Sequence, residues 1–169
     1  MPARTYRGIV LTLLAAWLVL GVWHLPTLTA APDEAQEVTR LINNERAARG
    51  LPILSLDPLL STVAQQHSDD MAAHNIFSHT GSDGRGFWER IVGSDYPATF
   101  GGVVVAAGYG SAADVVRGWM GSPNHQHILL LPDVAQIGVG HAQRSGTTYS
   151  HYWTVEVSQP VDGYAPPDS

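Results

Sequence analysis

Apolar residues recur with a helical period through most of this chain and alternate with polar residues near its end. The two periods separate the segments that favour helices from those that favour strands. We expect helices over 33–49, 57–76, 84–92, 111–120 and 123–130, and strands over 103–107, 136–142 and 149–157. Because helices come first and an antiparallel hairpin comes last, this order argues against a doubly wound parallel sheet and predicts an α+β sandwich.

Capping and turn residues support several of these boundaries. Asp57 and Pro58 form an N-cap and first-turn pair, and Ser111 with Asp114 forms a capping box. Ser145-Gly146 marks the turn between the last two strands. The aromatic side chains are spaced as core residues, namely Phe77, Phe87, Trp88, Trp119 and Trp153.

The N-terminus carries an export signal. Arg4 and Arg7 precede an apolar run over 8–23, which is followed by Pro26 and by small residues up to Ala31. The run is shorter than the roughly 20 residues of a typical membrane span, so residues 1–31 are either a cleaved signal peptide or an N-terminal membrane anchor. We favour cleavage after Ala31, and we expect membrane contact through 8–23 if the segment is retained. The predicted domain covers 32–158, and the proline-containing tail 159–169 is expected to be disordered.

Composition excludes several classes of function. The chain has no cysteine, so disulfides, cysteine-ligated zinc and a thiol nucleophile are all excluded. Its formal charge is −6, and removal of two arginines with residues 1–31 leaves seven arginines against fifteen acidic residues, or −8. An acidic domain without a basic stripe is not expected to bind nucleic acid. The sequence therefore predicts a protein that is secreted or held on the extracytoplasmic face of the membrane.

An ordered series of motifs resembles the CAP superfamily, also called SCP-domain proteins, which comprises cysteine-rich secretory, antigen-five and pathogenesis-related proteins. The motifs are LINNER at 41–46, GLP at 50–52, Ala64 and His67 with Asp70-Met71, FSH at 77–79, WMGSPNH at 119–125, IGVG at 137–140 and YWT at 152–154. Together they cover residues 35–157, and the chain is most similar to the cysteine-free bacterial branch. The resemblance implies a three-layer α-β-α sandwich with a small central antiparallel sheet.

The same resemblance implies a cleft built around two histidines and two acidic residues. His79 and His125 match the two histidines. Valine occupies position 103, where the family carries the glutamate of a Gly-Glu-Asn stretch, and Ser122 occupies the second acidic position. We therefore expect His79, His125, Val103 and Ser122 to line the cleft, with both family carboxylates replaced.

This loss has a chemical consequence. A zinc site in a protein normally has at least three protein ligands, so His79 and His125 alone are a weak metal site. Zinc is the candidate ion for this site, and the sequence implies no certain cofactor. Metal-activated water would also require a nearby acid or base. We therefore expect a binding module rather than an enzyme, with a lipid, peptide, glycan, other small molecule or partner protein as ligand. Two alternatives remain: a metal-dependent hydrolase completed by Glu89 or Glu156, and a structural cell-envelope protein with no cleft ligand.

The other histidines and carboxylates have simpler interpretations. His67, Asp70 and His74 share a helix face, which is compatible with a metal site but more typical of a boundary histidine beside an exposed Asp70–His74 pair. We expect Glu89 beside Arg90, and Glu156 on the polar strand face, to form solvated surface pairs. There is no nucleophile elbow for a Ser-His-Asp triad and no phosphate-binding loop.

Overall fold

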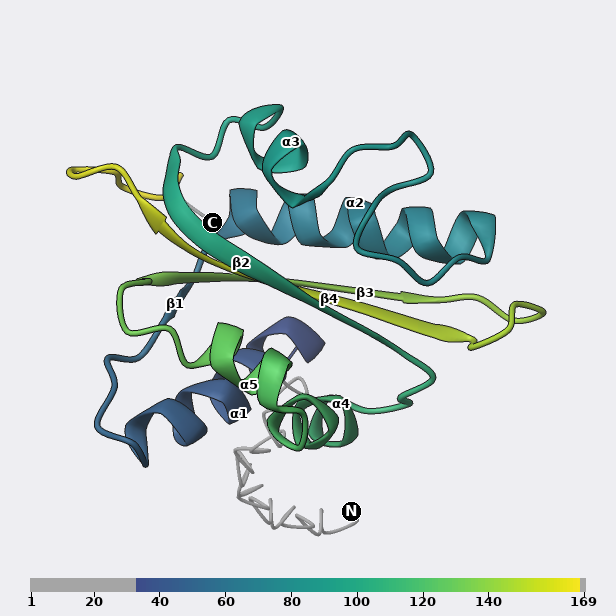
Figure 1. Cartoon of the computed structure of the whole chain (residues 1–169), viewed down its shortest axis with the longest axis horizontal. Coiled ribbons are helices and arrows are strands. Elements are labelled where there is room, and N and C mark those ends of the chain that lie inside the picture. Colours follow the sequence, from purple (N-terminus) through teal and green to yellow (C-terminus); the bar gives the residue numbers. More distant parts are fainter. Residues whose placement is uncertain (1–32, 168–169) are drawn as a thin grey trace, which may run out of the picture. The chain divides into compact units, whose positions relative to one another are not determined.

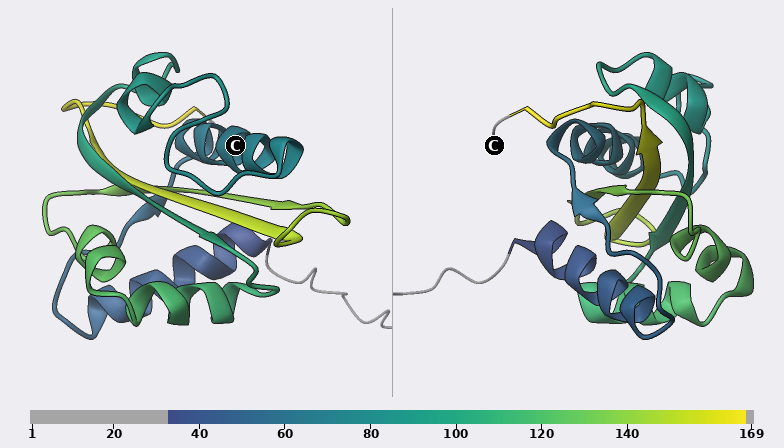
Figure 2. Two further views of the ribbon diagram at one scale, coloured as in Figure 1. Left: turned by 45° about the vertical axis from the view of Figure 1, so that its right-hand side comes forward. Right: turned by 90° about the vertical axis from the view of Figure 1, so that its left-hand side faces the viewer.

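A central sheet is covered by helices on both faces, and this arrangement confirms the three-layer α+β sandwich (Figures 1 and 2). The structure is a computed structural model that describes residues 33–167. One helical layer contains α2 (Pro58–His74) and α3 (Phe87–Val92), and the other contains α1 (Glu34–Ala47), α4 (Ala112–Met120) and α5 (Pro123–Leu129). The predicted signal or anchor segment lies outside the described residues, and no helix within those residues is long and apolar enough to cross a membrane.

Four strands form the sheet in the order β1-β3-β4-β2. The long strands β2 (Ala98–Ala107), β3 (Gln136–Gln143) and β4 (His151–Pro160) are antiparallel, and β1 (Ser55–Leu56) pairs with β3 in parallel. The sequence did not predict β1, because two residues give no measurable alternation. Strand β4 runs to Pro160, two residues beyond the expected end of the domain. The structure also places part of the expected tail, since Tyr164 donates a hydrogen bond to Asp57 Oδ2 at 3.0 Å.

Local capping sets the start of two helices as expected. The Asp57 side chain accepts a hydrogen bond from the Leu60 amide at 2.8 Å and begins α2. Ser111 accepts one from the Asp114 amide and begins α4. At the end of α2, Asn75 adopts a left-handed conformation, so the chain turns away from the helix axis into the loop that carries His79.

Two glycines in β3 allow α2 to lie directly on the sheet. A Cβ atom added to Gly138 would lie 2.3 Å from the Leu60 carbonyl carbon, and one added to Gly140 would lie 2.4 Å from the Ala64 backbone. Real Cβ atoms do not approach backbone this closely, so only glycine permits the contact. The position of α2, and of the loop that follows it, therefore depends on these two residues.

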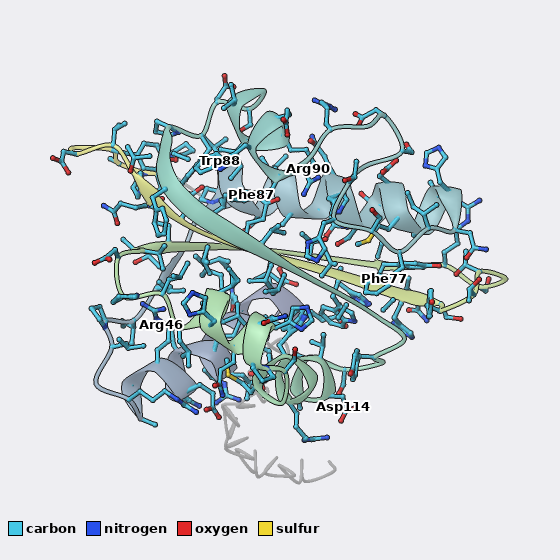
Figure 3. The ribbon with its side chains drawn as sticks, in the orientation of Figure 1. Arg46, Phe77, Phe87, Trp88, Arg90 and Asp114 are labelled. Atoms are coloured by element: carbon cyan, nitrogen blue, oxygen red, sulfur yellow. The ribbon has the colours of Figure 1, made fainter. Side chains whose placement is uncertain are left out.

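A buried arginine fixes the opposite layer. Arg46 of α1 is 0% exposed and donates to the carbonyl oxygens of Pro52, Leu129 and Leu131 at 2.8–2.9 Å (Figure 3). These bonds tie α1 to the C-terminal end of α5, the short helix that carries His125.

The aromatic predictions are half right. Trp119 and Trp153 are buried in the core between the sheet and the α1/α4 layer. Phe77 and Trp88 are instead 48% and 42% exposed (Figure 3). Phe77 lies on the loop after α2 and Trp88 lies on α3, and both face away from the sheet toward solvent.

Candidate functional site

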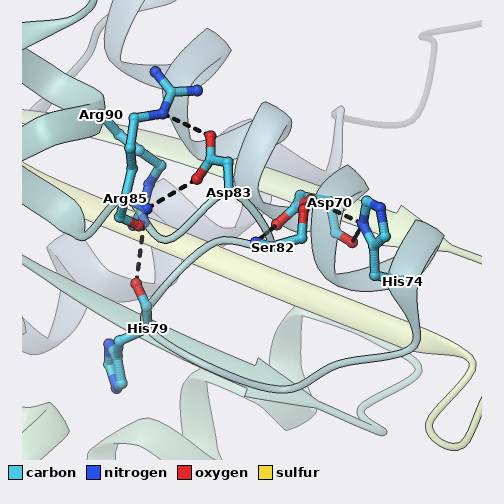
Figure 4. Close-up of polar contacts among 7 residues, drawn as sticks. All are labelled: Asp70, His74, His79, Ser82, Asp83, Arg85 and Arg90. Carbon is cyan, nitrogen blue, oxygen red and sulfur yellow. Dashed lines mark hydrogen bonds and ion pairs between the residues drawn. The ribbon is translucent and has the colours of Figure 1, made fainter.

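The loop that carries His79 is held from beneath by two buried side chains. Arg90 of α3 donates from Nη1 to the His79 carbonyl oxygen at 3.0 Å, and His67 of α2 donates from Nε2 to the Ser78 carbonyl oxygen at 2.9 Å. Figure 4 shows the His79 carbonyl directed toward Arg90, with its imidazole pointing away from the Asp83–Arg85 pair. The backbone of residues 78 and 79 is therefore fixed while the His79 ring remains exposed.

Further along, the same loop is bonded to α2 and folds on itself. Asp70 accepts hydrogen bonds from the Ser82 amide and hydroxyl at 2.7 and 2.5 Å, and Arg85 pairs with Asp83 at 2.6 Å (Figure 4). The expected exposed pair between Asp70 and His74 is present at 2.9 Å. These contacts give Asp70 a loop-holding role in place of a metal-binding one.

His67 is more deeply buried than a boundary residue. It is 1% exposed, and burial, reinforced by the nearby Arg90 charge, lowers its pKa to about 4. A neutral imidazole that donates from Nε2 leaves Nδ1 as a buried acceptor, and within the described residues this atom has no hydrogen-bond partner.

Arg90 also faces a fully buried carboxylate. Its Nη2 atom lies 3.8 Å from Oε1 of Glu156, whose side chain is 0% exposed. Burial raises the pKa of Glu156 to about 8, with the Arg90 charge opposing the increase. The predictions of solvated surface pairs for Glu156 and Glu89 are therefore wrong. Arg90 turns into the protein toward Glu156 and the His79 carbonyl, whereas Glu89 is exposed on α3.

Glu156 lies directly opposite Val103 in the sheet. The register pairs Val103 of β2 with Glu156 of β4, so both side chains point to the α2/α3 face. Val103 packs on the apolar cluster that contains Met71 and Tyr152 and is only partly buried. The carboxylate opposite Val103 is therefore that of Glu156, which lies one strand further from the edge of the sheet and faces Arg90.

His125 approaches the same edge of the sheet from the opposite layer. Helix α5 packs on β2, where Ile128 lies against Gly102, and His125 is half-buried in its first turn. Ser122 is the N-cap of α5, and its own side chain makes no capping bond. Partial burial lowers the pKa of His79, with further decreases from His125 and Arg90, which places the two imidazoles in one electrostatic environment.

These residues do not fit a zinc site. The donor set consists of two imidazoles, Val103 supplies no ligand atom, and Glu156 is sequestered by Arg90. Among the described residues no three histidine, aspartate or glutamate side chains converge on a common point suited to a metal ion. The two imidazoles offer hydrogen bonds to a ligand, but the arrangement lacks the charge balance that a divalent cation requires.

A second polar cluster on other elements escaped sequence analysis. His141 of β3 bonds to Glu34 of α1 through Nδ1 and to His151 Nδ1 of β4 through Nε2, the latter at 3.1 Å. The His141 ring stacks on Trp153 at 3.7 Å between ring centroids. His151 is partly buried and hydrogen-bonded within this cluster. The sequence signal for the cluster was the register between the last two strands, which places His141 opposite Trp153.

Comparisons with known proteins agree with this geometry. Residues 39–157 match the family model described as "CAP: Cysteine-rich secretory protein family". The chain is 30% identical over 128 residues to the Bacillus subtilis protein YkwD, covering 73% of this chain and 49% of YkwD. It therefore spans about half the length of that relative.

Solved structures show the same fold. An extracellular SCP-domain protein of Bacillus anthracis superposes with a TM-score of 0.67 at 26% identity, over 75% of this chain and 40% of the other. An outer surface protein of Borrelia burgdorferi superposes with a TM-score of 0.65 at 23% identity, over 73% and 90%. Because the family model covers well over half of the chain and the folds agree, this chain belongs to the CAP family of cysteine-rich secretory proteins.

Proposed function

We propose that this chain is an extracytoplasmic CAP-domain binding module. Its cleft, around His79, His125, Val103 and Ser122, takes an apolar or neutral ligand and carries out no metal chemistry. The ligand classes that suit such a cleft are lipids, peptides, glycans and envelope proteins. Residues 1–31 deliver the domain across the membrane, and the fold that binds the ligand extends from residue 32 to the end of β4.

The observation that carries this proposal is the position of Glu156. Residue 103, where the family resemblance implies a carboxylate, lies on the outer strand, whereas Glu156 lies one strand inward, fully buried and beside Arg90. Glu156 is fully buried and its carboxylate lies 3.8 Å from the Arg90 guanidinium, so it is not free to replace the missing ligand. Valine at the cleft instead favours an apolar or neutral group.

The location of the domain is supported by two independent features. An Arg-flanked apolar run at the N-terminus is typical of export, and the similar solved structures include an extracellular protein and an outer surface protein. The lack of cysteine is compatible with either side of the membrane, so it does not enter the argument.

A zinc titration tests the proposal against the hydrolase alternative. We would titrate the full-length chain by calorimetry beside the His79→Ala/His125→Ala double variant and beside Val103→Glu. We expect no binding tighter than about 1 μM in the wild type, because that affinity corresponds to about −8 kcal/mol and requires a third ligand. We expect Val103→Glu to bind zinc measurably more tightly.

Two outcomes would contradict the proposal. Micromolar or tighter zinc binding that the double variant loses would restore the hydrolase alternative, with Glu89 or a rearranged Glu156 as the third ligand. A folded Val103→Glu variant with unchanged zinc affinity would show that residue 103 does not face the two histidines. If the cleft variants altered no binding to any ligand class, the structural envelope role would be favoured.

A further inference from the structure

We propose that the outer edge of β2, over residues 99–103, binds an extended peptide through main-chain hydrogen bonds. This inference rests on the proposed function and deepens it, since it selects a peptide among the ligand classes of the cleft. Strand β2 is the last strand of the sheet on that side, and Figure 1 shows it in front with no strand beyond it. Val103 is shared between the edge and the cleft.

The hydrogen-bond pattern shows which groups face outward. In an antiparallel pair, alternate residues bond to the partner strand and the residues between them point away. The Gly108 amide bonds to the His151 carbonyl at 2.9 Å, and these residues continue the β2–β4 register. It follows that Gly102 and Val104 bond to β4, whereas the amides and carbonyls of Gly101 and Val103 point away from it.

The direction of one neighbouring carbonyl supports this assignment. Val105 has the same parity as Val103, and its carbonyl accepts a bond from the Trp119 indole of α4 at 3.3 Å instead of one from β4. Within residues 33–167 no side chain or main-chain group is bonded to the outward amides and carbonyls of Gly101 and Val103.

The opposite edge of the sheet, formed by β3 beyond the short β1, is covered by side chains of α2. Where β3 extends beyond the short β1, the Val139 amide bonds to Ser61 Oγ at 3.4 Å. Both main-chain groups of His141 bond to the Gln65 side chain at 2.9–3.0 Å. Proteins commonly cover sheet edges to prevent unwanted strand pairing, and here α2 covers one edge while the Gly101–Val103 edge stays open.

Side chains on both sides of the open edge suit an apolar peptide. Phe100 is 43% exposed and lies on the same face of the sheet as Gly102, whose α-carbon faces Ile128 of α5. On the other side, α3 packs near the start of β2 through Phe87 and Ala98 and presents the 42% exposed Trp88 (Figure 3). Since peptide side chains alternate between two faces, successive residues would meet the α5 side and the α3 side in turn.

Main-chain geometry favours a peptide over the other ligand classes. Gly101 and Val103 each present one amide donor and one carbonyl acceptor. The two residues are about 7 Å apart along the strand, because each extended residue rises by about 3.4 Å. An extended peptide carries donors and acceptors at the same repeat, and strand addition to a free edge is a recurrent mode of peptide recognition. A lipid chain offers no such groups, and a glycan offers hydroxyls without this repeat.

The first test requires no ligand. Amide hydrogen exchange, followed by NMR on the full-length chain, should show Gly101 and Val103 exchanging at least tenfold faster than Gly102 and Val104. Equal protection of all four amides would mean that the outward groups are already bonded, and it would overturn the proposal.

The second test measures pairing directly. A random seven-residue peptide library displayed on phage would be selected against the full-length chain, and enriched sequences would be synthesised with single N-methyl groups along the peptide. We expect binding to fall at least tenfold when the methyl group is at alternate positions and to change little at the others, because only alternate amides face β2. We also expect Val103→Pro, which removes an outward amide at a position tolerated on edge strands, to abolish binding, whereas Val103→Thr retains it.

The outcomes separate this inference from the proposed function. Peptides that bind with no alternation in the methyl scan, and equally to Val103→Pro, would overturn edge pairing but leave a binding module. If no peptide is enriched above background, edge pairing is likewise overturned. Tight zinc binding at His79 and His125, by contrast, would overturn the proposed function itself. If Val103→Pro fails to fold, the methyl scan decides alone, since it leaves the protein unchanged.

Discussion

Replacing Glu156 by glutamine should change how the stability of this protein depends on pH. Glu156 is 0% exposed, and its pKa is raised to about 8 from an ordinary value of 4.5. Glutamine has nearly the same shape but carries no titrating proton. The wild type and the variant should therefore differ in the slope of stability against pH even where their absolute stabilities are similar.

The sign and the size follow from proton linkage. Between pH 4.5 and 8 the folded chain holds a proton on Glu156 that the unfolded chain releases, so the free energy of unfolding decreases as pH rises. His67 acts in the opposite direction, because its pKa is lowered to about 4 from 6.5, and the lowered pKa of His79 has the same sign. Both histidine effects are only partly complete at pH 6.5, where an unfolded histidine is half protonated, and they are complete by about pH 7.5.

Above about pH 7, Glu156 is therefore the group whose shift controls the slope. The carboxylates with lowered pKa values act below about pH 4, and the buried Tyr96 hydroxyl acts only above its ordinary value of 10. One proton changes stability by about 1.4 kcal/mol per pH unit, so Glu156 alone should lower stability by about 1.6 kcal/mol between pH 6.5 and 8. The remaining histidine effects return up to about 0.8 kcal/mol, so the wild type should lose about 1 kcal/mol in this interval.

Urea unfolding of the full-length chain, followed by tryptophan fluorescence at pH 6.5, 7.0, 7.5 and 8.0, measures this loss. The Glu156→Gln variant should lose no stability over the same interval and should gain up to about 0.8 kcal/mol, because only the histidines then contribute. Wild-type stability that is flat or increases from pH 6.5 to 8 would show that Glu156 is ionised as a partner of Arg90 and would refute the reasoning. An equal slope in the variant would assign the proton to another group.

Two further predictions concern the fold that positions the cleft. Gly140→Ala should lower the free energy of unfolding by about 3 kcal/mol or more, because the new Cβ would lie 2.4 Å from the α2 backbone, while Gly121→Ala, whose nearest neighbour is 3.4 Å away, should cost under about 1 kcal/mol in the same thermal unfolding assay. Asp57→Ala should cost about 1–2 kcal/mol, because it removes the α2 cap and the bond from Tyr164, whereas Asp33→Ala, at an N-cap without a side-chain bond, should be nearly neutral; equal losses in the two aspartate variants would contradict the role of the cap.

Hydrophobic period and capping residues were sufficient to predict the helices, the antiparallel hairpin of β3 and β4 and the second half of β2, whereas the small antiparallel sheet was implied by the family resemblance. They were insufficient at Glu156 for a definite physical reason. Alternation in β4 shows that Tyr152, Thr154 and Glu156 share a face, but it does not show whether that face is in water. In a three-layer sandwich helices cover both faces, and all three residues are buried. The polar residues of β4 therefore form buried contacts, such as the 2.9 Å bond between Ser68 and Thr154.

Arg90 shows the same difficulty at a helix. Its neighbour Glu89 suggested a surface pair, but adjacent residues on a helix point in different directions. Only the packing of α3 on β2 shows that Arg90 points inward to Glu156 and to the His79 carbonyl. His79 and His125 could be located because a family motif surrounds each one. The side chains that position the His79 loop could not, because they come from α2, α3 and β4 and share no local pattern.

The position of the acid on β4 rather than on β2 changes what it does in this protein. On the edge strand, a carboxylate at residue 103, where the family resemblance implies one, could balance the charge of a cation. On β4, Glu156 is buried and faces Arg90, which in turn bonds to the backbone of His79. The acid is thus buried near Arg90, with neither carboxylate oxygen hydrogen-bonded to another described residue, and it is not presented to a ligand. With valine at 103, the polar groups that the edge still offers to a ligand are the outward amides and carbonyls of Gly101 and Val103. Hydrogen bonding to the main chain, rather than coordination of a metal ion, is therefore the chemistry that these groups of the edge strand can offer to a ligand.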